Sequence, residues 1–127
     1  MPEACPCDTG KPYAACCGAL HDGRRVAATA VQLMRSRYAA FALGLSDYLV
    51  QTWHPSTRPG SVDIDPAMTW TGLEIEATTK GSAWEDDGTV RFAASWTSGR
   101  HHGVLRETSQ FALVDGRWVY VNGIVHR

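Results

Sequence analysis

The chain has 127 residues, 44% of them hydrophobic and 20% charged, a composition that excludes an intrinsically disordered protein and suits one compact domain with a small appendage. Twelve basic and thirteen acidic residues give a formal net charge of -1, so the chain as a whole lacks the positive field that non-specific nucleic-acid binding needs. Neither a signal-peptide pattern nor a run of about eighteen apolar residues occurs, and we expect a cytoplasmic protein.

Four cysteines form two pairs near the N-terminus, Cys5 with Cys7 and Cys16 with Cys17. Two thiolate pairs that approach from opposite sides can supply the tetrahedral coordination of Zn²⁺, whereas a disulfide within either pair would be strained. Because four sulfurs fill the coordination sphere, one zinc ion bound here would be structural. A redox or iron–sulfur role and unliganded thiols are the alternatives.

The cysteines belong to a longer pattern, Cys5-Pro6-Cys7-Asp8-Thr9-Gly10-Lys11-Pro12-Tyr13, continued by Cys16-Cys17-Gly18. This pattern resembles the SEC-C zinc motif, which occurs at the C-terminus of the SecA translocase motor and in several bacterial proteins. The resemblance implies one structural zinc ion and suggests a protein partner or a ribosome-associated surface. Asp8 and Thr9 replace a small residue and a serine of the motif, and neither is a ligand. Gly10 and Gly18 follow the cysteine pairs, where we expect positive φ. We assign residues 1–25 to this zinc-binding motif and a linker.

The first helix is predicted to begin after the linker. Thr29 and Gln32 have the spacing of a capping box, in which each side chain satisfies a free amide of the first turn, and Gly44 is expected to end the helix. Gln32 and Arg35 are expected to face water. Apolar residues recur at three- and four-residue intervals on the opposite face: Leu33, Met34, Tyr38, Phe41, Ala42 and Leu45.

A second, shorter helix is predicted to complete a helical hairpin. Ser46 is the expected cap, and the helix is expected to include Trp53 because Pro55 prevents its continuation. Residues 55–66 hold several proline, glycine and acidic residues, which predicts an irregular connection.

From Trp70 onward the apolar period changes to two, which predicts antiparallel strands. Asp115-Gly116 predicts a tight hairpin into a last strand around residues 118–121. Helices followed by such a meander indicate an α+β fold in which a curved sheet wraps around the first helix. The residues expected on one face are Leu73, Ile75 and Ala77, then Val90, Phe92, Ala94 and Trp96, then Leu105, Glu107, Ser109, Phe111 and Leu113.

Further stretches carry a second resemblance: Leu33–Tyr38, Tyr48-Leu49 with Thr52–Ser56, Trp70–Leu73 and Asp115–Trp118. They are similar to the YchJ-like family, in which a SEC-C motif precedes an α+β domain of the nuclear-transport-factor-like, or cystatin-like, class. The resemblance implies that residues 26–127 form this cone-shaped domain behind an N-terminal zinc knuckle. The family is largely uncharacterised, so the resemblance implies a fold and a metal but no reaction.

A curved sheet closed by helices can enclose a pocket, and large rings and polar residues are candidates to line it. The alternative is that the rings fill a solid core. Glu107 and Ser109 share a face with apolar residues, so they need partners if that face turns inward, and Arg37, Tyr38 and His54 are the candidates. The pocket candidates are Arg37, Tyr38, Trp53, Trp70, Trp96, Glu107, Ser109, Trp118 and Tyr120.

Three functions are compatible with these patterns. The first is a structural-zinc-containing binding protein that takes a small ligand in the cone or a protein partner through the zinc motif. The second is a small-molecule enzyme of hydrolase or isomerase type that uses Glu107 or His54 as acid or base. The third is nucleic-acid or ribosome-associated binding through the zinc motif and nearby arginines: Arg24, Arg25, Arg35 and Arg37. Most other histidines are expected to be exposed, in the linker, near a turn or at the C-terminus: His21, His101, His102 and His126.

Overall fold

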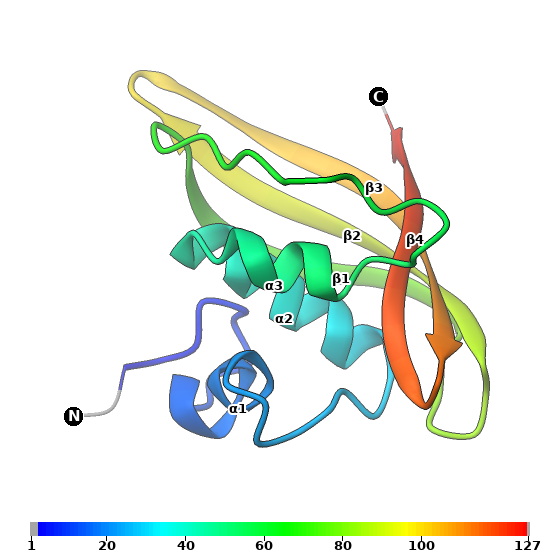
Figure 1. The fold of residues 1–127 in the computed structure, drawn as a ribbon. Helices are drawn as coiled ribbons and strands as arrows, with labels where there is room; N and C mark the ends of the chain where they lie inside the picture. Colours follow the sequence, from blue (N-terminus) through cyan, green and yellow to red (C-terminus); the bar gives the residue numbers. More distant parts are fainter. Residues whose placement is uncertain (1–2, 127) are drawn as a thin grey trace.

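The computed structural model describes residues 3–126 and has an α+β fold in which the helices cover one face of a four-stranded antiparallel sheet (Figure 1). The first two residues of the predicted zinc-binding segment 1–25 and the last residue of the predicted domain 26–127 lie outside the described residues. None of the described helices is long and apolar enough to cross a membrane. In chain order the elements are the 3-10 helix η1 (Tyr13–Ala15), the helices α1 (Cys17–His21), α2 (Ala30–Leu43) and α3 (Ser46–Gln51), and the strands β1 (Thr69–Lys80), β2 (Asp87–Ser98), β3 (His101–Val114) and β4 (Arg117–His126).

Helix α2 begins and ends at the predicted residues. The Gln32 amide donates to Thr29 Oγ1 at 3.1 Å, and Gly44 closes the helix in the left-handed region with φ of 75°. The observed capping box differs from the predicted one in a single contact. Gln32 Oε1 accepts from the Ala28 amide at 2.8 Å, whereas the standard motif has it accept from the amide of the N-cap residue Thr29. The local signals at both ends were therefore sufficient to place the helix.

Helix α2 is buried on more sides than a single apolar stripe predicts. It contacts α1 and α3 on one side and β1, β2 and β4 on the other, so it forms the middle layer of the molecule. Ser36 and Arg37 are buried for this reason, although they lie outside the predicted stripe. Ala42, which was predicted to face the core, is exposed at the end of the helix.

The second helix begins one residue earlier than predicted. Leu45 is the N-cap of α3 and makes no side-chain cap, so the prediction that Ser46 caps this helix is wrong. The Leu45 amide donates to the carbonyl of Ala40 in α2, and Leu45 directly follows the C-cap Gly44, so no residue separates the two caps. The helix ends at Gln51, before Trp53, which forms a parallel bridge with Tyr120 of β4. This bridge attaches the helical hairpin to the sheet.

The sheet has the strand order β1-β2-β3-β4 and three irregularities in register, after Trp70, after Ile75 and after Gln110. Such bulges bend and twist a sheet, and Figure 1 shows the strands curving around α2. The bulge after Ile75 also explains why Ala77 is exposed although alternation placed it inward. Strand β3 starts earlier than predicted, so His101 and His102 are its first residues, and both lie next to the turn at Gly99 and are exposed, as predicted.

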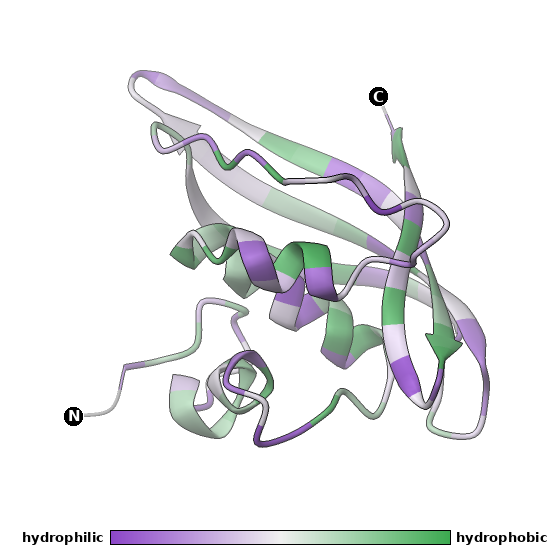
Figure 2. Cartoon of the chain, in the orientation of Figure 1, coloured by the Kyte–Doolittle hydropathy of each residue, from purple (hydrophilic) through white to green (hydrophobic). Residues whose placement is uncertain are grey.

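The main core lies between α2 and the concave face of the sheet. Figure 2 shows hydrophobic residues along α2 and the strands that cross it, whereas the long connection before β1 alternates between hydrophilic and hydrophobic residues. The buried core cluster includes Leu33, Met34, Tyr38, Leu73, Val90, Phe92, Ala94, Phe111 and Trp118, and the cysteines Cys5, Cys7 and Cys17 are continuous with it.

Candidate functional site

The N-terminal knuckle, residues 3–25, brings the sulfur atoms of the four predicted ligands together. An antiparallel bridge between Ala4 and Pro12 closes the loop that carries the first pair, and η1 turns the chain into α1 at the second pair. Four sulfurs placed tetrahedrally about a zinc ion are separated by about 3.8 Å. The donor set and its spacing therefore fit a metal ion. All four Sγ atoms lie within 4.8 Å of one another, those of Cys5, Cys7, Cys16 and Cys17.

The buried thiols of the knuckle influence one another's protonation. Burial raises the pKa of Cys5 to about 11, whereas the hydrogen bond from Cys17 lowers the pKa of Cys7 to about 4. The same hydrogen bond, together with burial, raises the pKa of Cys17. Cys5, Cys7 and Cys17 therefore do not lose their protons independently, and the positive charge of a bound cation would favour the thiolate forms that metal binding needs.

The two glycines of the motif serve different purposes. Gly10 has φ of 82°, as predicted, and allows the loop to turn between the cysteine pairs. Gly18 does not have positive φ, so that prediction is wrong. A Cβ atom at Gly18 would lie 2.7 Å from the carbonyl oxygen of Tyr13, and the residue is required because η1 and α1 approach too closely for a side chain.

Two polar contacts fasten the knuckle to the α+β domain. The Leu73 amide donates to Asp8 Oδ2 at 3.0 Å, next to the first bulge of the edge strand β1. Arg35 Nη1 of α2 donates to the carbonyl oxygen of Cys7, so Arg35 does not simply face water as predicted. Asp8 therefore has a structural role that the sequence did not reveal, because its partner is 65 residues away in the chain.

A third attachment passes through His21, which is the last residue of α1 and half-buried rather than part of a linker. His21 Nε2 lies 2.7 Å from the carbonyl oxygen of Ser36 and must donate to it, so Nδ1 of the neutral ring accepts from the Tyr13 hydroxyl at 2.6 Å. The Tyr48 hydroxyl donates to Ser36 Oγ at 2.8 Å and joins α3 to the same network. Burial lowers the pKa of His21, which favours this neutral form.

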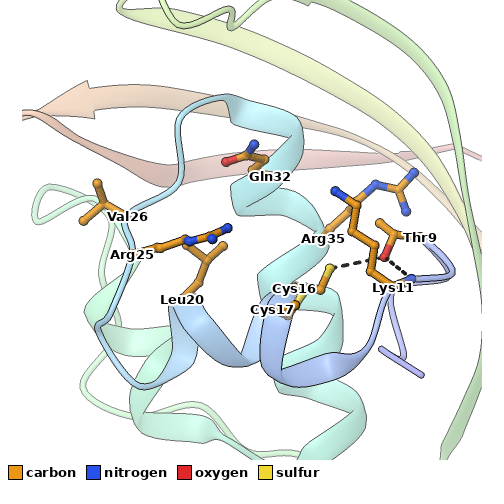
Figure 3. A pocket seen from close by; sticks show the side chains of 10 residues that line it. Thr9, Lys11, Cys16, Cys17, Leu20, Arg25, Val26, Gln32 and Arg35 are labelled. Carbon is orange, nitrogen blue, oxygen red and sulfur yellow. Dashed lines mark hydrogen bonds between the residues drawn. The ribbon is translucent and has the colours of Figure 1, made fainter. Parts of the chain in front are cut away.

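The arginines predicted to form one basic surface are separated in the structure. Arg37 is buried inside the cone, and Arg24 pairs with Asp22 at 2.7 Å and also donates to the Ala14 carbonyl. Arg25 and Arg35 line a surface cleft of about 130 Å³ between the knuckle and α2 (Figure 3). The other residues of the cleft are Thr9, Lys11, Ala15, Cys16, Cys17, Leu20, Val26 and Gln32.

The cone is not filled by side chains and contains a partly open cavity of about 240 Å³ with mostly apolar walls. Most of the predicted pocket residues line it: Arg37, Tyr38, Trp53, Trp70, Glu107, Ser109 and Tyr120. Prediction missed the apolar residues that complete the wall, although the period-two and helical patterns already placed most of them on the inward face: Met34, Phe41, Phe92, Ala94, Leu105 and Phe111.

Two predicted pocket residues lie elsewhere. The Trp96 ring packs on Gly103 of the neighbouring strand, where an added Cβ atom would lie 2.8 Å from the ring. Trp118 is 4% exposed, and its Nε1 donates to the carbonyl oxygen of Ala28 at 3.2 Å, so it fastens β4 to the start of α2. Both predictions were wrong because the cavity occupies only part of the length of each strand. The alternation pattern shows on which face of the sheet a residue lies, but not whether it lies beside the cavity.

The polar groups of the cavity do not pair as predicted. Arg37 Nη1 donates to the carbonyl oxygen of Leu49 at 2.8 Å and to Thr52 Oγ1 at 2.6 Å, and burial lowers the pKa of Arg37 to about 10. Among residues 3–126, no carboxylate lies within ion-pair distance of Arg37. Glu107 instead accepts from Ser109 Oγ at 2.6 Å.

His54 is not part of the cavity wall. Its Nδ1 accepts from the backbone amide of Ser56 at 3.0 Å and lies 2.8 Å from the hydroxyl of the same residue, in the connection after α3. His54 was a predicted acid or base and a predicted partner of Glu107. The structure contradicts both roles inside the cone, because the ring does not line the cavity and its Nδ1 is bonded to Ser56.

Comparison with known proteins gives two family matches. Residues 29–123 match the model described as "YchJ, middle NTF2-like domain", and residues 1–19 match the SEC-C motif. A UPF0225 protein of Streptomyces avermitilis is 52% identical over 123 residues, which cover 97% of this chain and 85% of that protein. A UPF0225 protein of Corynebacterium glutamicum is 46% identical over 125 residues, which cover 98% of this chain and 99% of that protein.

Solved structures agree with the fold. The solution structure of a SEC-C motif containing protein from Rhodopseudomonas palustris has a TM-score of 0.85 at 34% identity and covers 98% of this chain and 100% of that one. A crystal structure of a SEC-C motif containing protein from Psychrobacter arcticus has a TM-score of 0.81 at 28% identity, with coverage of 98% and 84%. A putative calmodulin-dependent kinase II association domain from Exiguobacterium sibiricum, at 15% identity and a TM-score of 0.56 over 76% of this chain and 88% of that one, shares the fold alone.

Proposed function

This chain belongs to the YchJ-like, UPF0225 family of SEC-C motif proteins, and we propose that it is a binding protein in which a structural zinc ion orders the knuckle and the cone holds a small, mostly apolar molecule. The observation that carries the proposal is the cavity of about 240 Å³, because a domain of this size would otherwise fill such a space with side chains. No catalytic step is part of the proposal.

The donor set supports zinc as the metal. Four cysteine sulfurs match the ligands and geometry of structural zinc sites, and they leave no open position for an activated water. The knuckle has little other cohesion, since η1 has no buried residue and the buried residues of α1 are Cys17, Gly18 and Ala19. Metal-binding energy would therefore be folding energy for this segment. A reducing, cytoplasmic location fits the proposal because four clustered thiols persist best there.

The cavity supports a ligand with an apolar body and a neutral polar head group. Arg37 lines the cavity, and its Nε and Nη2 atoms make no hydrogen bond with residues 3–126. Because no fully buried side-chain nitrogen of those residues lacks a partner, these two atoms keep some accessible surface and can donate to a ligand. Glu107 lies on the wall of the same cavity. A head group that both accepts from Arg37 and donates to Glu107, as a carboxamide does, suits a cavity with one cation and one carboxylate better than a charged head group does.

A series of three aromatic probes tests this proposal. Benzamide, benzoate and benzylamine share one ring and differ in head-group charge. We expect benzamide to bind most tightly, to shift the NMR signal of the Met34 methyl group and to change the fluorescence of the cavity tryptophans Trp53 and Trp70, which both line the wall. If none of the three probes perturbs these residues in a saturable way, the binding function is refuted.

A pair of variants controls for location. Leu105→Trp adds a large ring to the cavity wall and should abolish probe binding, whereas Val104→Trp adds the same ring to the exposed opposite face and should leave it unchanged. Equal loss of binding in both variants would contradict a site inside the cone.

The enzyme alternative has less support. Glu107 remains available as a base in the cavity, but His54 lies outside it and none of the other described histidines lines the wall. The second group that acid–base catalysis needs would then have to be Tyr38 or Tyr120. Burial raises the pKa of Tyr38 to about 12 and also raises the pKa of Tyr120, which disfavours either hydroxyl as a proton donor near neutral pH.

A further inference from the structure

We propose that the cleft between the knuckle and α2 is a binding site for a single oxyanion group, of which a phosphate group is the best-fitting example. The cleft is formed by four parts of the chain: the loop between the cysteine pairs, the segment from η1 into α1, the linker and the first turns of α2 (Figure 3). Three of these parts contribute one cation each, namely Lys11, Arg25 and Arg35. Among residues 3–126, no carboxylate lines the cleft. This site is separate from the cone and does not depend on the ligand proposed for it.

The polar side-chain groups at the cleft are free to donate. Neither the Lys11 nor the Arg25 side chain makes a hydrogen bond or ion pair with residues 3–126, and Arg35 uses only Nη1, for the Cys7 carbonyl. Gln32 uses its oxygen for the Ala28 amide, so its NH₂ group remains available. In Figure 3, Arg25 approaches from the linker side, Lys11 lies on the opposite side, and the Arg35 head group extends beyond Lys11. A tetrahedral oxyanion between them would accept from several donors at once.

The charge of a zinc-loaded knuckle has to be included. Zinc with four thiolates carries a charge of about -2, so the three cations leave a net charge of about +1 at the cleft. Cys17 is buried and Cys16 is half-buried, which keeps most of the thiolate charge behind the cleft surface. Arg24 adds nothing, because Asp22 neutralises it. The remaining positive charge is enough for one anionic group and too small for a polyanion.

The surroundings favour an isolated anionic group over a nucleic acid. A bound polynucleotide would have to continue past the cleft, but Arg24 is already paired, Arg37 is buried, and the whole chain carries a net charge of -1. The aliphatic residues Leu20 and Val26 border the cationic groups, and Val26 is 54% exposed. A small phosphate ester with an apolar substituent beside its phosphate matches this arrangement.

Titration of the zinc-loaded full chain with inorganic phosphate tests the proposal by amide NMR. We expect saturable shifts at Lys11, Arg25, Gln32 and Arg35 with a Kd of about 1 mM or tighter. Gln32→Glu keeps the oxygen that caps the Ala28 amide but replaces the donor group with a carboxylate, so it should weaken phosphate binding by about tenfold without unfolding α2. Arg25→Ala should weaken it similarly because it removes one of the three cations, and it should keep the fold because the Arg25 side chain makes no hydrogen bond or ion pair with residues 3–126.

Arg24→Ala is the matched control, since it removes the same charge from the neighbouring residue, which does not line the cleft. Its phosphate affinity should stay within about twofold of the wild type. Equal weakening by Arg24→Ala and Arg25→Ala would overturn the proposal in favour of non-specific attraction. So would the absence of saturable shifts at the cleft, or binding of a single-stranded RNA oligonucleotide with a steep salt dependence while phosphate does not compete for it. Zinc content and the amide spectrum show that each variant is folded.

Discussion

The hydrogen bond between Asp8 and β1 allows us to estimate how much the Asp8 carboxylate stabilises the docking of the knuckle on the α+β domain. Asp8 has φ of 65°, and its Oδ2 accepts from the Leu73 amide at 3.0 Å. A hydrogen bond to a charged acceptor contributes about 1.5–3 kcal/mol, and the exposure of Asp8 favours the lower end. Alanine in the left-handed region costs about 1 kcal/mol more. Asp8→Ala should therefore destabilise docking by about 2.5 kcal/mol.

Two further substitutions separate these contributions. Asp8→Gly keeps the backbone conformation and removes the acceptor, so it should cost about 1.5 kcal/mol, whereas Asp8→Asn keeps both and should cost less than about 0.5 kcal/mol. Native-state hydrogen exchange at the Leu73 amide measures the effect, and the Asp8→Gly protein should exchange about tenfold faster than the wild type. Zinc content should not change, because Asp8 is not among the sulfur ligands.

A charge-matched control is Asp63→Gly, which removes an exposed carboxylate from the connection before β1. Leu73 should exchange at the wild-type rate in that variant. If Asp8→Gly also exchanges at the wild-type rate, the hydrogen bond contributes nothing to docking and the reasoning from its geometry fails. Loss of zinc in Asp8→Gly would instead mean that Asp8 organises the metal site itself.

Three other perturbations follow from the same structure. Cys7→Ser should lose stoichiometric zinc by elemental analysis and disorder the knuckle while the amide signals of the sheet persist; full zinc content would contradict its assignment as a ligand. Trp118→Ala should lower the free energy of unfolding by about 3–5 kcal/mol in urea denaturation, because the ring is buried and bonded to Ala28, and an unchanged midpoint would contradict that burial. Burial lowers the folded-state pKa of His21 below its unfolded value of about 6.5, so its contribution to stability is present above about pH 6.5 and is lost as the pH falls through the folded pKa. The stability of His21→Gln should therefore fall less steeply with acid than that of the wild type, and parallel curves would refute this account.

Features governed by near neighbours were predictable from the sequence. Thr29 and Gly44 mark the ends of α2 because capping depends on residues within one turn, and Asp115-Gly116 makes the predicted hairpin for the same reason. Ser46 shows the limit of this reasoning. It was predicted to be the N-cap of α3, but Leu45, directly after the end of α2, occupies the N-cap position instead. Local signals identify a helix but do not show how adjacent elements compete for a residue.

Features that depend on distant contacts were not predictable in the same way. Alternation placed Trp96 and Glu107 on the inward face, but only the register among strands shows that Trp96 packs beside Gly103 while Glu107 reaches the cavity. The bulge after Ile75 reversed the expectation for Ala77, and no sequence signal marks it. Strand register and bulges determine where each side chain lies relative to the cavity. A list of aromatic residues therefore could not show whether the cone is solid or contains a cavity.

The knuckle is oriented by residues that the metal does not use. Asp8 binds β1, Arg35 binds the Cys7 carbonyl, and His21 links Tyr13 to the Ser36 carbonyl, so three contacts fix its position on the domain. A metal alone would order the loop without defining this arrangement, because sulfur coordination does not involve α2 or the sheet. The cleft beside Lys11 and Arg25 exists only when the knuckle is held against α2. Zinc binding and docking are therefore separable requirements, and the Asp8→Ala and Asp8→Gly variants should impair anion binding even where zinc is retained.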